Sequence, residues 1–194
     1  MTDYDFKTFP ILETPRFILR QMVEADADAV FAIRNDLEVT RHNIGAPYTD
    51  KEQALALIRD MAWNYGDQHE VRWGITLKHD PSSVIGMCGY NYWIRRDQRA
   101  AIGYDLAQAH WGQGIMPEAL RAIIGFGFQH MSLHRIEADV SAENVASQRV
   151  LENLGFQTEG RLREQYFEWG EFHDLMLYSP VSYTHLTLPT NREV

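Results

Sequence analysis

The alternation of apolar and polar residues divides the chain into strands and helices. Apolar residues at every second position predict seven strands, at residues 12–22, 71–78, 84–94, 100–106, 134–140, 156–168 and 171–178. Apolar residues at helical spacing predict four helices, at residues 23–36, 51–65, 114–131 and 144–154. Elements mixed in this order favour an α+β fold, a mixed α/β sheet with helices on its faces.

Turn and cap residues bound these segments. Thr49 or Asp50 caps the helix that begins at residue 51, and Gly66 ends it. Trp169 and Gly170 form the turn of a closing hairpin. A chain of 194 residues fits one domain, which we place at residues 10–179. Residues 180–194 follow a complete hairpin without helical periodicity, so we expect an extension outside the fold.

Composition narrows the class of protein. Apolar residues make up 45% of the chain and charged residues 23%, which excludes a disordered chain. Neither a membrane-spanning run nor a signal peptide is present, and Cys88 has no second cysteine to pair with, so we expect a cytoplasmic protein. The net charge of −9 argues against direct binding of nucleic acid. It suits an amine-bearing substrate, or it serves only solubility.

A glycine-containing turn before the third helix is a candidate anion site. Residues 107–120 read AQAHWGQGIMPEAL and hold Gly112 and Gly114. Pro117 is tolerated only in the first helical turn, so the helix must begin near Gly114. The first amides of a helix have no internal partners and attract anions. The turn alone is equally consistent with a tight connection that binds nothing.

The start of the last helix carries the second candidate site. Asn144 is a good N-cap and Gly155 a good residue to end the helix. Ser147 lies in the first turn, where serine is common. Capping explains Asn144 without any ligand, and a further role depends on the segments that surround it.

The chain resembles the GCN5-related N-acetyltransferase (GNAT) superfamily. The resemblance runs from Leu12 to Ser179 in the correct order, through the segments LETPRFILR, IGYDL, WGQGIMPEAL, NVASQRVLENLGF, and EGRLRE followed by GEFHDLMLYS. Within the superfamily it is similar to the RimJ/RimL-like branch of ribosomal-protein N-terminal acetyltransferases. The family's phosphate signature begins with Gln or Arg and ends with Gly or Ala, whereas here Trp111 stands first and Met116 last.

The resemblance implies a binding site for acetyl-CoA as co-substrate. The sheet splays between residues 100–107 and 135–140, and acetyl-CoA lies in the gap. The pantetheine arm pairs with the backbone near Leu106 and Ala107. Asn144 and Ser147 face the pantetheine and the thioester sulfur. The pyrophosphate accepts hydrogen bonds from the amides of Gly112, Gln113, Gly114, Ile115 and Met116.

The implied reaction is direct attack of a primary amine on the thioester through a tetrahedral intermediate. A backbone N–H near Leu106 is expected to stabilise the oxyanion. Ser147 is the first candidate to protonate the leaving thiolate, and Tyr166 is the second. Candidate bases are Glu164 and Glu168, on the same strand face as Tyr166, and then Glu118 and Asp105. Attack by an already neutral amine, with water removing the proton, is the alternative.

The acceptor amine carries no motif that we can decode. The resemblance favours a protein N-terminal α-amine, and a small amine (a polyamine or aminoglycoside) or a non-catalytic acyl-CoA-binding module are the alternatives. Aromatic residues either line an acceptor pocket or belong to the core; they are Trp63, Trp73, Tyr90, Tyr92 and Trp93. His130 and His134 have a zinc-compatible spacing but no third ligand, so no metal site is expected. Monomer and homodimer both fit the sequence.

Overall fold

A computed structural model describes residues 5–43 and 45–180 of the chain. One eight-stranded sheet runs through the molecule in the order β1-β2-β3-β4-β5-β6-β8-β7. Its strands are β1 (Leu12–Glu13), β2 (Phe17–Arg20), β3 (Val71–Leu77), β4 (Asp80–Ile94), β5 (Arg99–Leu106), β6 (Arg135–Ser141), β7 (Phe156–Glu168) and β8 (Glu171–Pro180). All neighbours are antiparallel except β5 and β6, which confirms the predicted mixed sheet.

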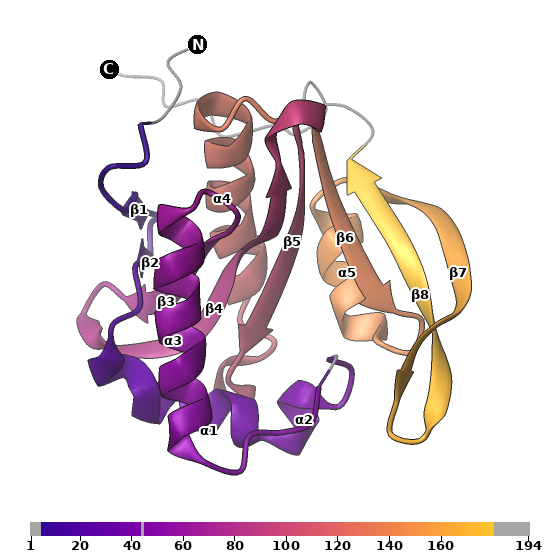
Figure 1. The fold of residues 1–194 in the computed structure, drawn as a ribbon, viewed down its shortest axis with the longest axis horizontal. Coiled ribbons are helices and arrows are strands. Elements are labelled where there is room, and N and C mark those ends of the chain that lie inside the picture. Colours follow the sequence, from indigo (N-terminus) through magenta and orange to yellow (C-terminus); the bar gives the residue numbers. More distant parts are fainter. Residues whose placement is uncertain (1–4, 44, 181–194) are drawn as a thin grey trace.

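Helices cover both faces of the sheet (Figure 1). The helices are α1 (Ala27–Asn35), α2 (Leu37–Thr40), α3 (Lys51–Gly66), α4 (Ile115–His130) and α5 (Val145–Asn153). Short 3₁₀ turns precede α1, follow β4 and precede α4, at Glu24–Asp26, Arg95–Asp97 and Gln108–His110. Helices α1 and α3 enclose one apolar cluster, and α4 and α5 pack on the opposite face over a larger one.

Two predicted boundaries were wrong. The strand expected at residues 12–22 is a small hairpin, because Pro15 lacks an amide and Thr14 exchanges hydrogen bonds with Phe17 across a tight turn. This turn produces an eighth strand. The segment after α1 also continues into α2, whose first turn is capped by the Asp36 side chain accepting from the amide of Glu38. The periodicity analysis missed α2 because a single helical turn is too short to show a period.

The sheet opens between its two halves. Strands β5 and β6 pair only at Arg99↔Arg135, Ala100↔Ile136 and Ala101↔Glu137. Beyond that point β6 pairs with β8 alone, and Figure 1 shows β5 and β6 diverging toward the end that α2 occupies. This divergence confirms the predicted splay, and it leaves one edge of β5 without a strand partner from residue 102 onward.

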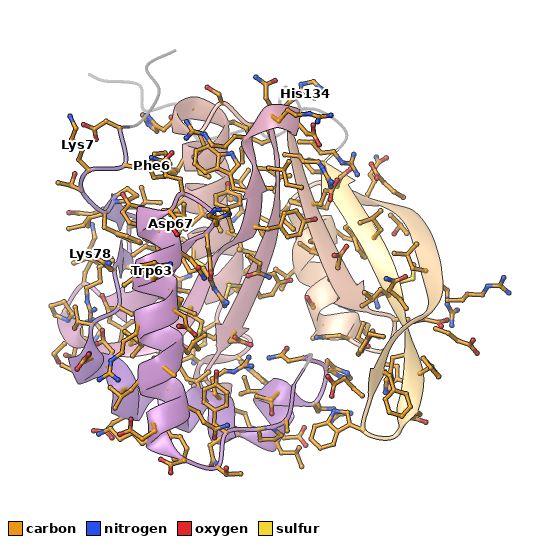
Figure 2. All side chains as sticks on the ribbon, in the orientation of Figure 1. Phe6, Lys7, Trp63, Asp67, Lys78 and His134 are labelled. Carbon is orange, nitrogen blue, oxygen red and sulfur yellow. The ribbon has the colours of Figure 1, made fainter. Side chains whose placement is uncertain are left out.

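Most of the aromatic residues considered for an acceptor pocket belong to the core instead. Trp73 and Tyr90 are fully buried, and Trp93 is nearly so. The Tyr90 hydroxyl donates to the carbonyl of Ile123 on α4 at 2.7 Å. Trp63 points to the solvent from α3, away from the gap in the sheet (Figure 2).

Candidate active site

The turn before α4 contains two glycines in the left-handed backbone region. Gly112 and Gly114 have φ angles of 73° and 68°, which glycine adopts without the strain that a side chain would add. Helix α4 begins at Ile115, so Pro117 lies in its first turn as predicted. Met116 is buried in the core and therefore packs beneath the loop. The free amides at the start of α4 thus open onto the cleft that the same residues line.

Arg16 holds this loop in place by hydrogen bonds to its carbonyls, an arrangement that we call the Arg16 brace. Its guanidinium donates to the carbonyl of Gln113 at 2.9 Å and to that of Gly114 at 3.1 Å. Its Nε donates to Glu118 on α4 at 2.7 Å, and its backbone amide donates to the same carboxylate at 3.0 Å. Burial opposes the effect, but bonds from Thr14 and Arg16 hold the pKa of Glu118 below its usual value. The sequence contained Arg16 in a family segment but gave no sign of this role.

The free edge of β5 faces the loop across the cleft. The indole Nε1 of Trp111 donates to the carbonyl of Leu106 at 2.8 Å, so the unusual Trp111 fixes the end of the strand. Alternate residues of a strand direct their main-chain groups to the same edge, which places the amides of Tyr104 and Leu106 toward the gap. Leu106 lines the cleft as expected. The amide of Ala107 instead donates to Ile85 on β4, and Ala107 does not line the cleft.

Two hydroxyl groups meet where β5 and α5 approach each other. The Tyr104 hydroxyl and the Ser147 Oγ are 2.6 Å apart. Burial raises the pKa of Tyr104 to about 12, although its bond with Ser147 works in the opposite direction. Asn144 caps α5, since its side chain accepts from the amide of Ser147 at 3.0 Å. The pair Tyr104–Ser147 is therefore a protonated donor at the base of the gap, and sequence reasoning missed Tyr104.

A single cleft joins these parts. It has a volume of about 900 Å³ and runs between the α4 loop, the free edge of β5, β6, the start of α5 and the segment that follows α1. Gly112, Gln113, Gly114, Ile115, Met116, Asn144 and Ser147 all line it. Of the residues expected to bind acetyl-CoA, Ala107 alone lies outside the lining of this cleft.

Two of the carboxylates considered as bases, Asp105 and Glu118, have other partners. Asp105 is buried and accepts from Arg34 at 3.3 Å and from Asn43 at 2.7 Å. Glu118 belongs to the Arg16 brace. Glu164 sits at a bulge with a φ angle of 50°, outside the cleft lining, which breaks the alternation that was expected to align it with Tyr166.

The mouth of the cleft lies between the segment after α2 and the β7–β8 hairpin. Glu168 accepts from the amide of Gly45 at 3.0 Å, joining residues far apart in the sequence. Tyr166 lines the cleft and stacks on His173 at a ring distance of 5.1 Å. Tyr166 therefore belongs to the mouth, whereas Tyr104 makes the contact with Ser147 at the base.

Two further expectations concern metals and membranes. Within residues 5–43 and 45–180, no group of three or more His, Cys, Asp or Glu side chains is arranged to hold a metal ion. In the same residues, no helix has the length and apolar character that crossing a bilayer requires. His130 lies against Phe126, and the amide of His134 donates to Gln98 at the far end of the sheet.

Comparison with known families identifies the family to which the chain belongs. The family model of the acetyltransferase (GNAT) domain matches residues 16–157, which include both the α4 loop and α5. The chain belongs to the GNAT family. It is an acetyl-CoA-dependent N-acetyltransferase. The residues that the family model matches include the glycine-containing loop before α4.

Individual relatives agree with this assignment. The chain is 39% identical to the uncharacterized N-acetyltransferase YoaA of Bacillus subtilis over 173 residues, which cover 89% of this chain and 97% of YoaA. It is 32% identical over 111 residues to the [ribosomal protein uS5]-alanine N-acetyltransferase of Escherichia coli, covering 57% of this chain and 54% of that enzyme. The solved structure of RimL, the ribosomal L7/L12 alpha-N-protein acetyltransferase, in complex with coenzyme A superposes with a TM-score of 0.80 at 20% identity, over 88% of this chain and 97% of RimL.

Proposed function

We propose that this GNAT domain acetylates the N-terminal α-amine of a protein. The α-amine has a pKa near 8, so about a tenth of it is neutral at pH 7, whereas an alkyl amine with a pKa near 10.4 is almost entirely charged. Asp105, Glu118 and Glu168 hold structural contacts, so none of the three is free to remove a proton from a strongly basic amine. An acceptor that is already partly neutral at pH 7 therefore fits the site without a base strong enough to neutralise an alkylammonium ion beforehand. The similarity to the uS5-alanine enzyme is the observation that carries the proposal.

The residues of the cleft have distinct parts in the proposed reaction. Acetyl-CoA, the donor substrate, places its pyrophosphate on the amides of Gly112 to Met116 and its pantetheine along the free edge of β5. The neutral amine enters from the mouth and attacks the thioester carbon. An amide on the β5 edge, near Leu106, stabilises the oxyanion as charge develops. The Tyr104–Ser147 pair gives a proton to the departing CoA thiolate.

Three acceptors with different amines test the substrate class. We would measure CoA release with a thiol reagent for a peptide with a free N-terminal alanine, for an Nα-acetylated peptide with one lysine, and for an alkyl diamine. We expect the first peptide to be preferred by more than about 100-fold, and mass spectrometry to place the acetyl group on its α-amine. Preference for the diamine or the lysine would overturn the protein N-terminus as acceptor.

A further inference from the structure

Strand β6 carries one carboxylate that faces the gap just past the point where the sheet opens. Its last pairing with β5 joins Ala101 to Glu137, and Asp139 follows two residues later. Ile136, Ala138 and Val140 are buried in the core beneath α4 and α5. Because side chains alternate along a strand, Asp139 points to the opposite face, where it lines the cleft and keeps part of its surface exposed.

The two carboxylates of this strand differ in what they bind. Glu137 is buried and accepts from Tyr92 at 3.0 Å, from Arg99 at 3.3 Å and from Arg135 at 2.6 Å. Asp139 makes no hydrogen bond or ion pair with any other residue that the structure describes. Glu137 is thus held in place by three donors, and Asp139 is left with free lone pairs in the cleft.

The surroundings of Asp139 make it a stronger base than an ordinary aspartate. Partial burial and the neighbouring charge of Glu137 raise its pKa. Titratable and charged groups on this face include Tyr92 from β4, Arg99 from β5, and Arg135 and Glu137 from β6 itself. Arg34 and Arg72, which both pair with Asp105, line the same cleft together with it. Strand β8 presents the apolar Leu177 opposite Asp139. Arg99 and Arg135 are engaged by Glu137, so neither forms an ion pair with Asp139.

We propose that Asp139 is the catalytic residue that accepts the proton which the amine loses on attack. The inference rests on the proposed amine acetylation but not on the identity of the amine. The nitrogen lone pair forms the C–N bond, the carbonyl π pair moves to oxygen, and the N–H proton passes to the Asp139 carboxylate. Collapse then re-forms the carbonyl and breaks the C–S bond, and the thiolate takes its proton from Tyr104–Ser147. Solvent returns both groups to their starting states.

The opened sheet explains why the two proton transfers do not interfere. Tyr104 and Ser147 lie on the face that α4 and α5 cover. Asp139 lies on the other face, where it lines the same cleft. A thioester held in the gap would therefore meet its amine from the Asp139 side and release its thiolate toward the hydroxyl pair.

Replacing the carboxylate without changing its size tests the assignment. We would compare Asp139→Asn, Asp139→Glu and, as a control, Asp67→Asn, an exposed carboxylate that follows the C-terminus of α3, away from the gap (Figure 2). We expect Asp139→Asn to lower kcat/KM by about 100-fold or more, the size typical of a lost general base. Asp139→Glu should recover part of this loss. Binding of CoA, measured by calorimetry, should stay unchanged in all three variants.

The pH profile separates a base from a merely structural residue. As the pH falls, the kcat/KM of the wild-type enzyme should decrease through protonation of the amine. At still lower pH it should decrease further through protonation of Asp139. Asp139→Asn should retain the first ionisation and lack the second. Unchanged kcat/KM, or an unchanged acid limb, in Asp139→Asn would overturn the assignment. A wild-type preference for the diamine would refute the protein acceptor alone, because the same profile measured with the diamine still decides the role of Asp139.

Discussion

Removing the side chain of Arg16 should weaken acetyl-CoA binding without changing the rate of the chemical step. The guanidinium holds two carbonyls of the α4 loop, and through Glu118 it ties that loop to the first turn of the helix. Each carbonyl held on one side keeps the following amide directed to the other side, where the pyrophosphate is proposed to lie. In Arg16→Ala the loop keeps its glycines but loses this brace, so the amides must be ordered at the moment of binding.

The magnitude follows from the contacts. A hydrogen bond to a charged group contributes about 1.5–3 kcal/mol when buried. The Arg16 side chain is 48% exposed, and exposed ion pairs contribute less than about 1 kcal/mol, so the lower end applies. We therefore expect a loss of about 1–2 kcal/mol, which corresponds to a rise of roughly 5- to 30-fold in the Kd for acetyl-CoA. Arg16→Lys keeps the charge but not the planar fork, and should fall between wild type and alanine.

Calorimetry with CoA and steady-state kinetics with a saturating acceptor test this prediction. The KM for acetyl-CoA should rise with the Kd, while kcat at saturating acetyl-CoA should stay within about twofold. The reason is that the lost contact stabilises the bound substrate and the transition state equally. Arg96→Ala provides the control, since that side chain is 94% exposed and lies outside the cleft. An unchanged Kd in Arg16→Ala would refute the brace, and so would a lower kcat with an unchanged Kd.

Three further perturbations address the loop, the proton donor and the core. Gly114→Val places a β-branched residue at a φ angle of 68°, which costs about 1–3 kcal/mol, and calorimetry should show CoA binding weakened by more than about tenfold. Ser147→Ala and Tyr104→Phe should each lower kcat by about 100-fold with little change in CoA binding. Because the Tyr104 pKa is raised to about 12, wild-type kcat should show no alkaline loss from this group below about pH 10. Gly127→Ala places a Cβ in steric conflict with the Tyr90 hydroxyl and should lower the free energy of unfolding by about 2 kcal/mol, and adding Tyr90→Phe should restore part of it.

The fold was largely predictable because its long elements have clear periods. Helix α4 was placed within one residue at each end, since Gly114 and Pro117 mark its start and the apolar stripe continues to Met131. The errors lie where a side chain overrides the pattern. Thr14 closes a turn inside one predicted strand, and the bulge near Glu164 shifts the register of β7 against β8. Such local contacts leave no periodic signal.

The site was predictable where main-chain groups act and obscure where side chains from distant segments meet. Glycines next to a helix start can be recognised in the sequence, so the α4 loop was placed correctly. Arg16 acts on a loop about a hundred positions away, and Tyr104 acts on Ser147. Asp139 shows no feature in the sequence beyond being a polar residue in an alternating strand. Only the pairing of β5 with β6 reveals that it faces the gap.

The contrast between main-chain and side-chain groups also indicates which elements select the acceptor. The proposed donor site consists mainly of backbone amides, so we expect it to tolerate Trp111, which donates to the end of β5, and Met116, which packs in the core. An acceptor entering from the mouth meets side chains instead, on the segment after α2 and on the β7–β8 hairpin. These two elements touch through Gly45 and Glu168, so a change in either alters the shape that the other presents. Substrate preference within the family should therefore vary with these two elements together, while the α4 loop keeps its geometry.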